Sequence, residues 1–163
     1  MISPMERSKK IIIASHCILN QNTVIPEEAR SKGLMKSAVE WCDQESYGIV
    51  QLPCPEFTYL GLNRPSMTRE EYDIQKYREH CQTILAPIMD QLRMYVESGY
   101  DLVGGFGIQS SPSCDPGRGI FMEEFLLLTK REGISIRYFW QIPATDNGYF
   151  DEKDPASHYG AIS

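Results

Sequence analysis

Four short apolar runs alternate with amphipathic segments along this chain, and that alternation restricts the fold more than any other feature. The runs cover residues 11–15, 48–52, 100–108 and 134–140. The first run is a continuous β-branched series, which is typical of a strand buried on both faces. Strands that alternate with helices form parallel sheets through right-handed crossovers. We therefore predict an α/β fold, Rossmann-like, with a mostly parallel sheet of about four strands and helices on both faces.

Helical spacing of apolar residues covers the segments between these runs, at residues 26–43, 68–99 and 120–131. Thr68 and Glu71 match a capping box, so the long second helix should begin there. Pro87 should kink or divide that helix, because proline removes a backbone hydrogen bond. At 163 residues the chain has the size of one domain. Residues 1–9 and 143–163 have no clear pattern, and we predict that they are tails of a single domain over residues 1–163.

Composition excludes several classes of protein. With 42% hydrophobic and 23% charged residues the chain is globular, and no apolar stretch reaches the roughly 20 residues that span a bilayer. A formal net charge of −6 disfavours a nucleic-acid polymer as partner. The amino-terminal segment has no apolar region typical of an export signal. Together with an odd number of cysteines, five, this predicts a reducing, cytoplasmic location without paired disulfides.

Cys17, Cys54 and Cys114 each follow a predicted strand. Because parallel strands end at the same edge of a sheet, the three thiols should meet there, where ligands bind in open α/β sheets. Three thiolates suit a metal or iron-sulfur centre that keeps one coordination position open. The alternative interpretation is that all three are small buried hydrophobic residues. Cys42 and Cys81 fall on apolar helical stripes, which predicts core positions for both.

Polar residues beside these cysteines are candidates for catalysis. Glu56 lies two residues beyond Cys54 and could act as a general acid or base, or else be an exposed loop carboxylate. Ser111 and Ser113 precede Cys114, where their hydroxyls could position substrate or donate to the centre, or serve only as turn residues. His16 adjoins Cys17 as a second candidate proton donor, or as a packed residue at a strand end.

Other polar groups near the same loops could bind a ligand. Arg64 and Arg118 could hold an anionic group. The amides of Asn20, Gln21 and Asn22 suit a heterocycle, and they are equally good turn residues.

Three motifs resemble those of the DUF523 group, which includes the thiouracil desulfidases. They are Ser15-His16-Cys17-Ile18-Leu19-Asn20, Leu52-Pro53-Cys54-Pro55-Glu56-Phe57 and Ser111-Pro112-Ser113-Cys114. This resemblance implies that Cys17, Cys54 and Cys114 hold a [4Fe-4S] cluster, and that its fourth iron binds the sulfur of a small thiolated substrate. The implied reaction is hydrolytic removal of that sulfur as hydrosulfide, with Glu56 handling the proton of water and Ser111 and Ser113 positioning substrate.

The chain departs from the desulfidase pattern at the positions where a substrate ring would be recognised. It has Asn20-Gln21-Asn22-Thr23 where characterised desulfidases have Arg-Tyr-Asp-Gly, and Asp115 where they usually have glycine. The substrate is therefore left open, with a thiolated nucleobase as one candidate. A different class of function also remains open, namely a non-enzymatic metal or cluster module for structure, sensing or sulfur relay.

Overall fold

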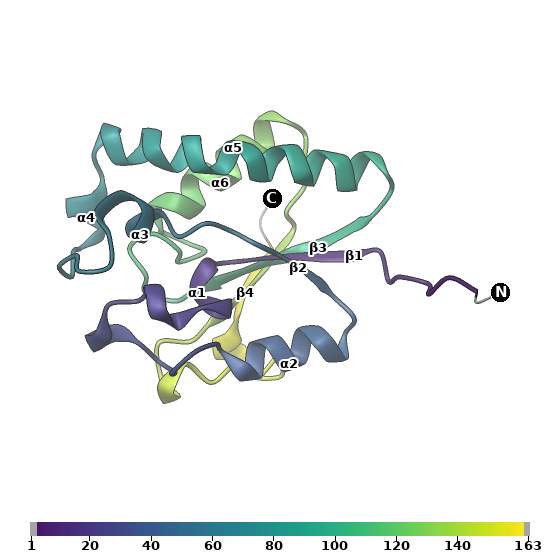
Figure 1. Cartoon of the computed structure of the whole chain (residues 1–163), viewed down its shortest axis with the longest axis horizontal. Coiled ribbons are helices and arrows are strands. Elements are labelled where there is room, and N and C mark those ends of the chain that lie inside the picture. Colours follow the sequence, from purple (N-terminus) through teal and green to yellow (C-terminus); the bar gives the residue numbers. More distant parts are fainter. Residues whose placement is uncertain (1–2, 162–163) are drawn as a thin grey trace.

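The computed structural model describes residues 3–161, which form a five-stranded sheet in the order β2-β1-β3-β4-β5 (Figure 1). The strands are β1 (Lys10–Ala14), β2 (Gly48–Gln51), β3 (Asp101–Ile108), β4 (Tyr138–Ile142) and β5 (His158–Ala161). Strands β1 to β4 run parallel to one another, and β5 is antiparallel to β4. The predicted α/β fold with a mostly parallel sheet is confirmed, although the sheet has five strands where about four were expected.

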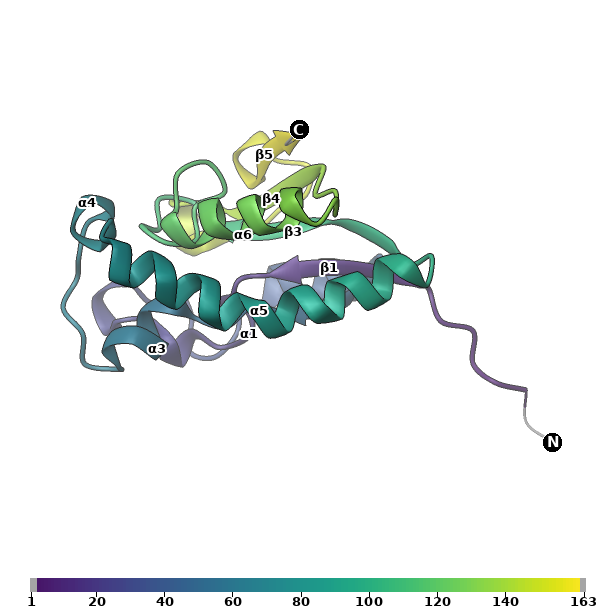
Figure 2. The same ribbon diagram turned by 90° about the horizontal axis from the view of Figure 1, so that it is seen from above.

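Helices cover both faces of this sheet, as predicted. They are α1 (His16–Leu19), α2 (Lys36–Gln44), α3 (Pro55–Leu60), α4 (Arg69–Tyr72), α5 (Gln75–Glu97) and α6 (Ile120–Arg131). Helices α5 and α6 lie side by side over one face and α2 lies against the other (Figures 1 and 2). Short 3₁₀ turns occupy Gln21–Thr23, Pro26–Glu28, Asp146–Gly148 and Pro155–Ser157.

Each face of the sheet has its own apolar core. Ile11 and Ile13 of β1 pack in the layer beneath α5 and α6, whereas Ile12 and Ala14 pack in the layer that contains Phe106 and the buried face of α2. Successive side chains of a strand point to opposite faces. The unbroken apolar run of β1 is therefore explained by burial on both sides.

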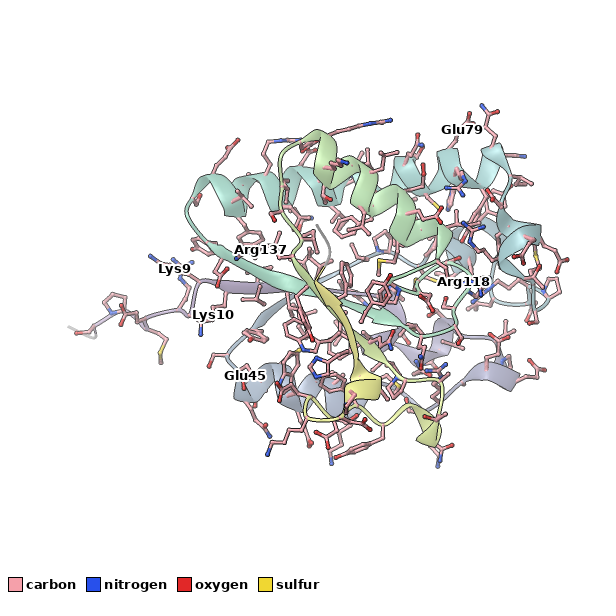
Figure 3. All side chains as sticks on the ribbon, turned by 180° about the vertical axis from the view of Figure 1, so that it is seen from behind. Lys9, Lys10, Glu45, Glu79, Arg118 and Arg137 are labelled. Carbon is pink, nitrogen blue, oxygen red and sulfur yellow. The ribbon has the colours of Figure 1, made fainter. Side chains whose placement is uncertain are left out.

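The order of the strands creates a switch point at β1. After β1 the chain adds β2 on one side, and it then crosses to add β3 on the other. Ligands of open α/β sheets bind outside the carboxyl ends of the strands at such a point. Figure 3 shows Arg118 at this edge of the molecule and Lys9 and Lys10 at the opposite end.

Two helix predictions need correction. The helix expected over residues 26–43 begins at Lys36, because Pro26–Glu28 forms only a 3₁₀ turn and an irregular segment follows it. The capping box of Thr68 and Glu71 is confirmed, but it starts the one-turn helix α4, and the long helix begins at Gln75.

Pro87 does not divide helix α5. It lies inside a continuous helix, on an exposed position where water can satisfy the carbonyl group that loses its partner.

The strand expected over residues 134–140 is also wrong at its start, since β4 covers Tyr138–Ile142. Ile134 and Ile136 are buried beneath the α5–α6 layer, but they belong to the connection that leads to β4. Their apolar character reflects burial and not strand pairing.

The carboxyl-terminal segment is not a loose tail over its described part. Phe150 is 2% exposed, and its ring packs against Trp41 and Phe106 with centroid distances of 5.2 and 4.6 Å. Strand β5 then pairs with β4. At the other end, residues 3–9 precede the sheet and are exposed (Figure 1). The tail predictions for residues 1–2 and 162–163 fall outside the described residues.

Within residues 3–161, no helix combines the length and the apolar composition needed to cross a membrane.

Candidate metal centre

The three cysteines that follow strands come together at the carboxyl edge of the sheet. Cys17 lies in α1 directly after β1, Cys54 is the N-cap residue of α3 after β2, and Cys114 lies in the loop between β3 and α6. All three line one cavity of about 650 Å³. Cys42 and Cys81 are instead buried in the core on α2 and α5. The predicted convergence of three thiols, and the exclusion of the other two, is confirmed.

The register of the strands explains why the thiols meet. Ala14 at the end of β1 is level with Gln51 of β2 and with Phe106 of β3. Just beyond, the amide of Leu52 donates to the carbonyl of Ala14 at 2.8 Å, and the amide of Ser15 donates to the carbonyl of Phe106 at 3.0 Å. The chains that carry the cysteines therefore leave the sheet at the same height.

The turn that carries Cys54 is held by short local contacts. Pro55 is the first residue of α3, a position that suits the fixed φ angle of proline. The sulfur of Cys54 accepts a hydrogen bond from the amide of Phe57 at 3.5 Å, and its carbonyl accepts one from the hydroxyl of Thr58 at 2.7 Å. This places Cys54 at the wall of the cavity and Glu56 one residue into the helix.

The loop that carries Cys114 is fixed by two polar side chains. The hydroxyl of Ser111 accepts hydrogen bonds from the amides of Ser113 at 3.3 Å and Cys114 at 3.0 Å. The carboxylate of Asp115 accepts from the amides of Ser110 at 2.7 Å and Gly117 at 2.8 Å. Asp115, which departs from the desulfidase pattern, is therefore a loop-forming residue, and it also lines the cavity.

Two glycines let this loop lie against the end of the sheet. A Cβ atom on Gly107 would lie 2.6 Å from the carbonyl oxygen of Cys114 and 2.6 Å from the ring of Pro116. A Cβ atom on Gly119 would lie 2.3 Å from the carbonyl oxygen of Ser113. Since side chains cannot approach backbone that closely, only glycine permits this path of the chain.

The structure separates the two predicted serines. Ser111 lines the cavity, where its hydroxyl proton is available while its oxygen accepts the two amides. Ser113 has no exposed surface, and its hydroxyl lies 2.6 Å from the hydroxyl of Tyr77. Its side chain is therefore bonded to α5 and does not line the cavity, so we do not retain a substrate contact for Ser113.

Glu56 lines the cavity and is paired with Arg64. The two side chains are 17% and 5% exposed, and the Nε of Arg64 donates to the carboxylate at 3.4 Å. The other guanidinium nitrogens of Arg64 donate to the carbonyls of Thr23 at 2.8 Å and Gly61 at 3.1 Å. The interpretation of Glu56 as an exposed loop carboxylate is thus wrong, and Arg64 is used to hold it.

The remaining predicted polar residues have less direct places at the site. Arg118 lies at the rim with its side chain 66% exposed, 3.7 Å from Glu70. Gln21 lines the cavity, but its amide donates to the carbonyl of Cys17 at 2.9 Å and accepts from the amide of Arg30 at 2.8 Å. Asn20 accepts from both nitrogens of Asn22, which makes this pair a local turn.

His16 is not among the residues that line the cavity. Partial burial lowers the pKa of its imidazole, and the nearby backbone of Leu52 opposes that shift. The ring is therefore neutral at pH 7, and its position favours the packed interpretation.

Sequence reasoning missed Arg30, which also lines the cavity. Its guanidinium donates to the carbonyls of Pro143 at 2.8 Å and Gln109 at 3.4 Å, and burial lowers its pKa. Arg30 lies in the irregular segment that was expected to be a helix, so no sequence pattern distinguished it from a surface arginine.

Burial sets the protonation of the three thiols. It raises the pKa of Cys17 to about 12, with a further contribution from the neighbouring thiol of Cys54. Burial also raises the pKa of Cys54, and it raises that of Cys114 together with the charges of Cys17 and Cys54. The thiols are therefore protonated in the metal-free protein at neutral pH, and they do not resemble an activated nucleophile.

Three thiol sulfurs are the donors that a sulfur-rich centre would use at this cavity. Among residues 3–161, no three His, Cys, Asp or Glu side chains are grouped closely enough to hold one metal ion. In a cluster each thiolate binds a different iron, so its ligands need not close around one point. The hydroxyl of Ser15, which follows β1, is also buried. Such a hydroxyl suits the sulfur atoms of a bound centre.

The fold and the site define a class, namely an α/β protein with a three-thiol cavity at the switch point of a parallel sheet. The chain is 41% identical over 145 residues to "Uncharacterized protein MJ0003" from Methanocaldococcus jannaschii, an alignment that covers 88% of this chain and 92% of that protein. The chain therefore belongs to the same family as that archaeal protein. No family model and no solved structure matches the chain.

Proposed function

We propose that this protein is an iron-sulfur-dependent desulfidase that removes sulfur from a small thiolated compound as hydrosulfide. The observation that carries the proposal is the convergence of Cys17, Cys54 and Cys114 on one cavity that also contains Glu56. The resemblance of the three cysteine motifs to the thiouracil desulfidases supports it. Five free cysteines argue for a reducing location, and we propose the cytoplasm.

Cys17, Cys54 and Cys114 are the residues that would hold a [4Fe-4S] cluster. When bound, the cluster would supply one iron with an open coordination position, which is a Lewis acid for a soft sulfur atom. The protein ligands thus leave space for substrate on the cavity side.

The residues of the chain would handle water and its proton. Glu56 accepts a proton from water, whose oxygen forms a bond to the carbon that carries sulfur. The carbon–sulfur bond then breaks, and sulfur leaves with its electron pair and takes the proton from Glu56 to form hydrosulfide, while the hydroxyl on carbon loses its remaining proton to solvent. The reaction exchanges sulfur for oxygen without net oxidation or reduction, so it requires no electron donor. Arg64 keeps the Glu56 carboxylate directed toward the cavity.

The hydroxyl of Ser111 would donate to substrate at the same wall. Its oxygen is held by the amides of Ser113 and Cys114, which leaves the proton as the group that can turn toward the cavity. Because these amides lie on the cysteine loop, the donor and the ligand sulfur are positioned by one element.

The direct test is hydrosulfide release from thiolated heterocycles. Protein reconstituted under anaerobic conditions is mixed with 2-thiouracil, 4-thiouracil and 2-thiocytosine, and hydrosulfide and the oxygen-substituted product are measured. We expect equal amounts of both products from at least one compound. A colourless protein with firmly bound zinc would instead support the non-enzymatic module, and a loaded protein that releases no hydrosulfide would reject the desulfidase.

A further inference from the structure

Residues 65–71, which we call the strap, form part of the wall of the cavity. The strap leads from the connection after α3 into α4, and Figures 1 and 2 show these two helices at the same end of the molecule. Most residues of the strap are exposed to solvent. Four of them also line the cavity, namely Met67, Thr68, Arg69 and Glu70. The strap therefore lies between the cavity and solvent.

The backbone of the strap is weakly attached to the fold. Within residues 3–161, none of its amides or carbonyls exchanges a hydrogen bond with a residue outside 65–73. Met67 is half-buried against the core. The two flanking residues are fixed, since the side chain of Arg64 is 5% exposed and Tyr72 is 1% exposed. A segment with few hydrogen bonds to its surroundings opens locally at low cost in free energy.

Arg69 joins the strap to the loop that carries Cys114. Its Nε donates to the carbonyl of Arg118 at 2.7 Å, near the end of that loop. One terminal nitrogen donates to Glu123 in the first turn of α6 at 2.6 Å, and the other donates to Asp73 just beyond α4 at 3.4 Å. A single planar guanidinium therefore connects the strap, the Cys114 loop and α6.

The other side-chain contacts of the strap are more exposed. The hydroxyl of Ser66 donates to Glu28 at 2.9 Å on the surface. Glu70 lies 3.7 Å from Arg118, and these side chains are 72% and 66% exposed. Exposed ion pairs of this kind contribute little to stability. The side chain of Arg69 is only 23% exposed, so its contacts are the main attachment of the strap to the Cys114 loop.

We propose that the strap is a gate of the cavity and that Arg69 is the positioning residue that holds it closed. A substrate enters when Arg69 releases the carbonyl of Arg118 and the carboxylate of Glu123. The closed strap then separates the cavity from bulk water. Glu123 keeps a partner in the open state, because Arg78 also donates to it at 3.0 Å. The gate depends on the geometry of the cavity and not on a bound cluster.

The test measures how fast two reagents modify the thiols of the metal-free, full-length protein under anaerobic conditions. Methyl methanethiosulfonate is small and pyrene maleimide is bulky, so a gate should restrict the second more than the first. Mass spectrometry of peptides gives a rate for each cysteine. Cys17, Cys54 and Cys114 report access to the cavity. Cys42 and Cys81 are buried in the core and report global unfolding.

In Arg69→Ala we expect pyrene maleimide to modify the cavity thiols about tenfold faster than in the wild type. This factor corresponds to the loss of one hydrogen bond to a charged group from the closed state. The rate for the small reagent should change less, and the core thiols should react as in the wild type. Arg93→Ala is the matched control, because Arg93 bonds to Asp90 at 3.0 Å and Glu132 at 2.7 Å but does not line the cavity. It should react like the wild type at every cysteine.

Three results would overturn the gate. Pyrene maleimide could modify the cavity thiols of Arg69→Ala no faster than those of the wild type. Both reagents could accelerate equally, which would show a change in thiol reactivity and not in access. The core thiols could accelerate as much as the cavity thiols, which would show a global loss of stability.

The outcomes are separate from those for the proposed function. The expected labelling in a protein that releases no hydrosulfide would keep the gate and reject the desulfidase. Hydrosulfide release by the wild type, with unchanged labelling in Arg69→Ala, would keep the desulfidase and reject the gate.

Discussion

Glu56 has an environment unlike that of an ordinary exposed loop carboxylate. Pro55 starts the helix that carries it, and the guanidinium of Arg64 holds it at 3.4 Å. Arg64 is in turn fixed by two backbone carbonyls. A carboxylate that is held this way at the wall of a cavity is already oriented to accept a proton from a water molecule in the cavity.

The first prediction concerns Glu56→Gln. The amide keeps the shape and an oxygen that can accept from Arg64, but it cannot take a proton from water. Because general acid-base help contributes about 100- to 10,000-fold in rate, hydrosulfide release should slow at least about 100-fold. Iron and sulfide content should equal that of the wild type.

The control for this variant is Glu70→Gln. Glu70 lines the same cavity, but its side chain is 72% exposed at the rim, so its loss should change the rate little. Normal turnover by Glu56→Gln would show that the base lies elsewhere. Loss of the cluster in that variant would make Glu56 a structural residue.

At the scale of the element, the loop between β3 and α6 positions a ligand through its backbone. Gly107 on β3 gives the space that the carbonyl of Cys114 and the ring of Pro116 occupy. The amide of Ile108 then donates to that carbonyl at 3.0 Å. The location of Cys114 thus depends on the absence of a side chain on the neighbouring strand.

The second prediction is that Gly107→Ala displaces the Cys114 loop. The new methyl group would overlap backbone, and such overpacking lowers the free energy of unfolding by about 1–3 kcal/mol. Urea unfolding of the metal-free protein measures this loss, and iron uptake should fall with it. Gly33→Ala is the matched control, because a Cβ atom there meets nothing within 4 Å. Equal behaviour of the two variants would contradict the packing argument.

At the scale of the whole molecule, the carboxyl-terminal segment completes the domain. Phe150 fills a pocket between Trp41 of α2 and Phe106 of β3, and strand β5 extends the sheet beyond β4. The ring of Tyr159 on β5 also lies against Gly117 of the Cys114 loop. The last segment therefore supports the side of the fold that carries the cavity.

The third prediction tests this support. Phe150→Ala should lower the free energy of unfolding by about 3–5 kcal/mol, since it removes a buried ring from a core. Tyr149 is the adjacent aromatic residue and is 64% exposed, so Tyr149→Ala should change stability by less than about 1 kcal/mol. Chemical denaturation of both variants measures these changes in the free energy of unfolding. If they were equally stable, the segment would not be part of the core.

Much of this fold could be predicted from sequence, because β1 and α6 are determined by local pattern. The continuous apolar run of β1 and the amphipathic stripe of α6 each specify one structure. Strand β5 could not be predicted, because its pairing with β4 depends on contacts made by the folded sheet. The helix prediction over the irregular segment that contains Arg30 was wrong for the same reason. The guanidinium of Arg30 donates to the carbonyls of Gln109 and Pro143, which are remote in the chain.

Part of the candidate site could be predicted from the sequence. The cysteines after β1, β2 and β3 were predictable, since parallel strands bring their ends to one edge. The separation of Ser111 from Ser113 was not, because the direction of a turn side chain depends on the partner that Tyr77 provides.

The most direct test of the central claim is anaerobic reconstitution followed by measurement of iron and sulfide. The account predicts about four iron and about four sulfide per wild-type chain, in keeping with a [4Fe-4S] centre. Cys54→Ala should lose most of both, whereas Cys81→Ala should keep nearly all, since Cys81 is buried in the core away from the cavity. A wild type that binds no iron, or folded variants that lose it equally, would contradict the account.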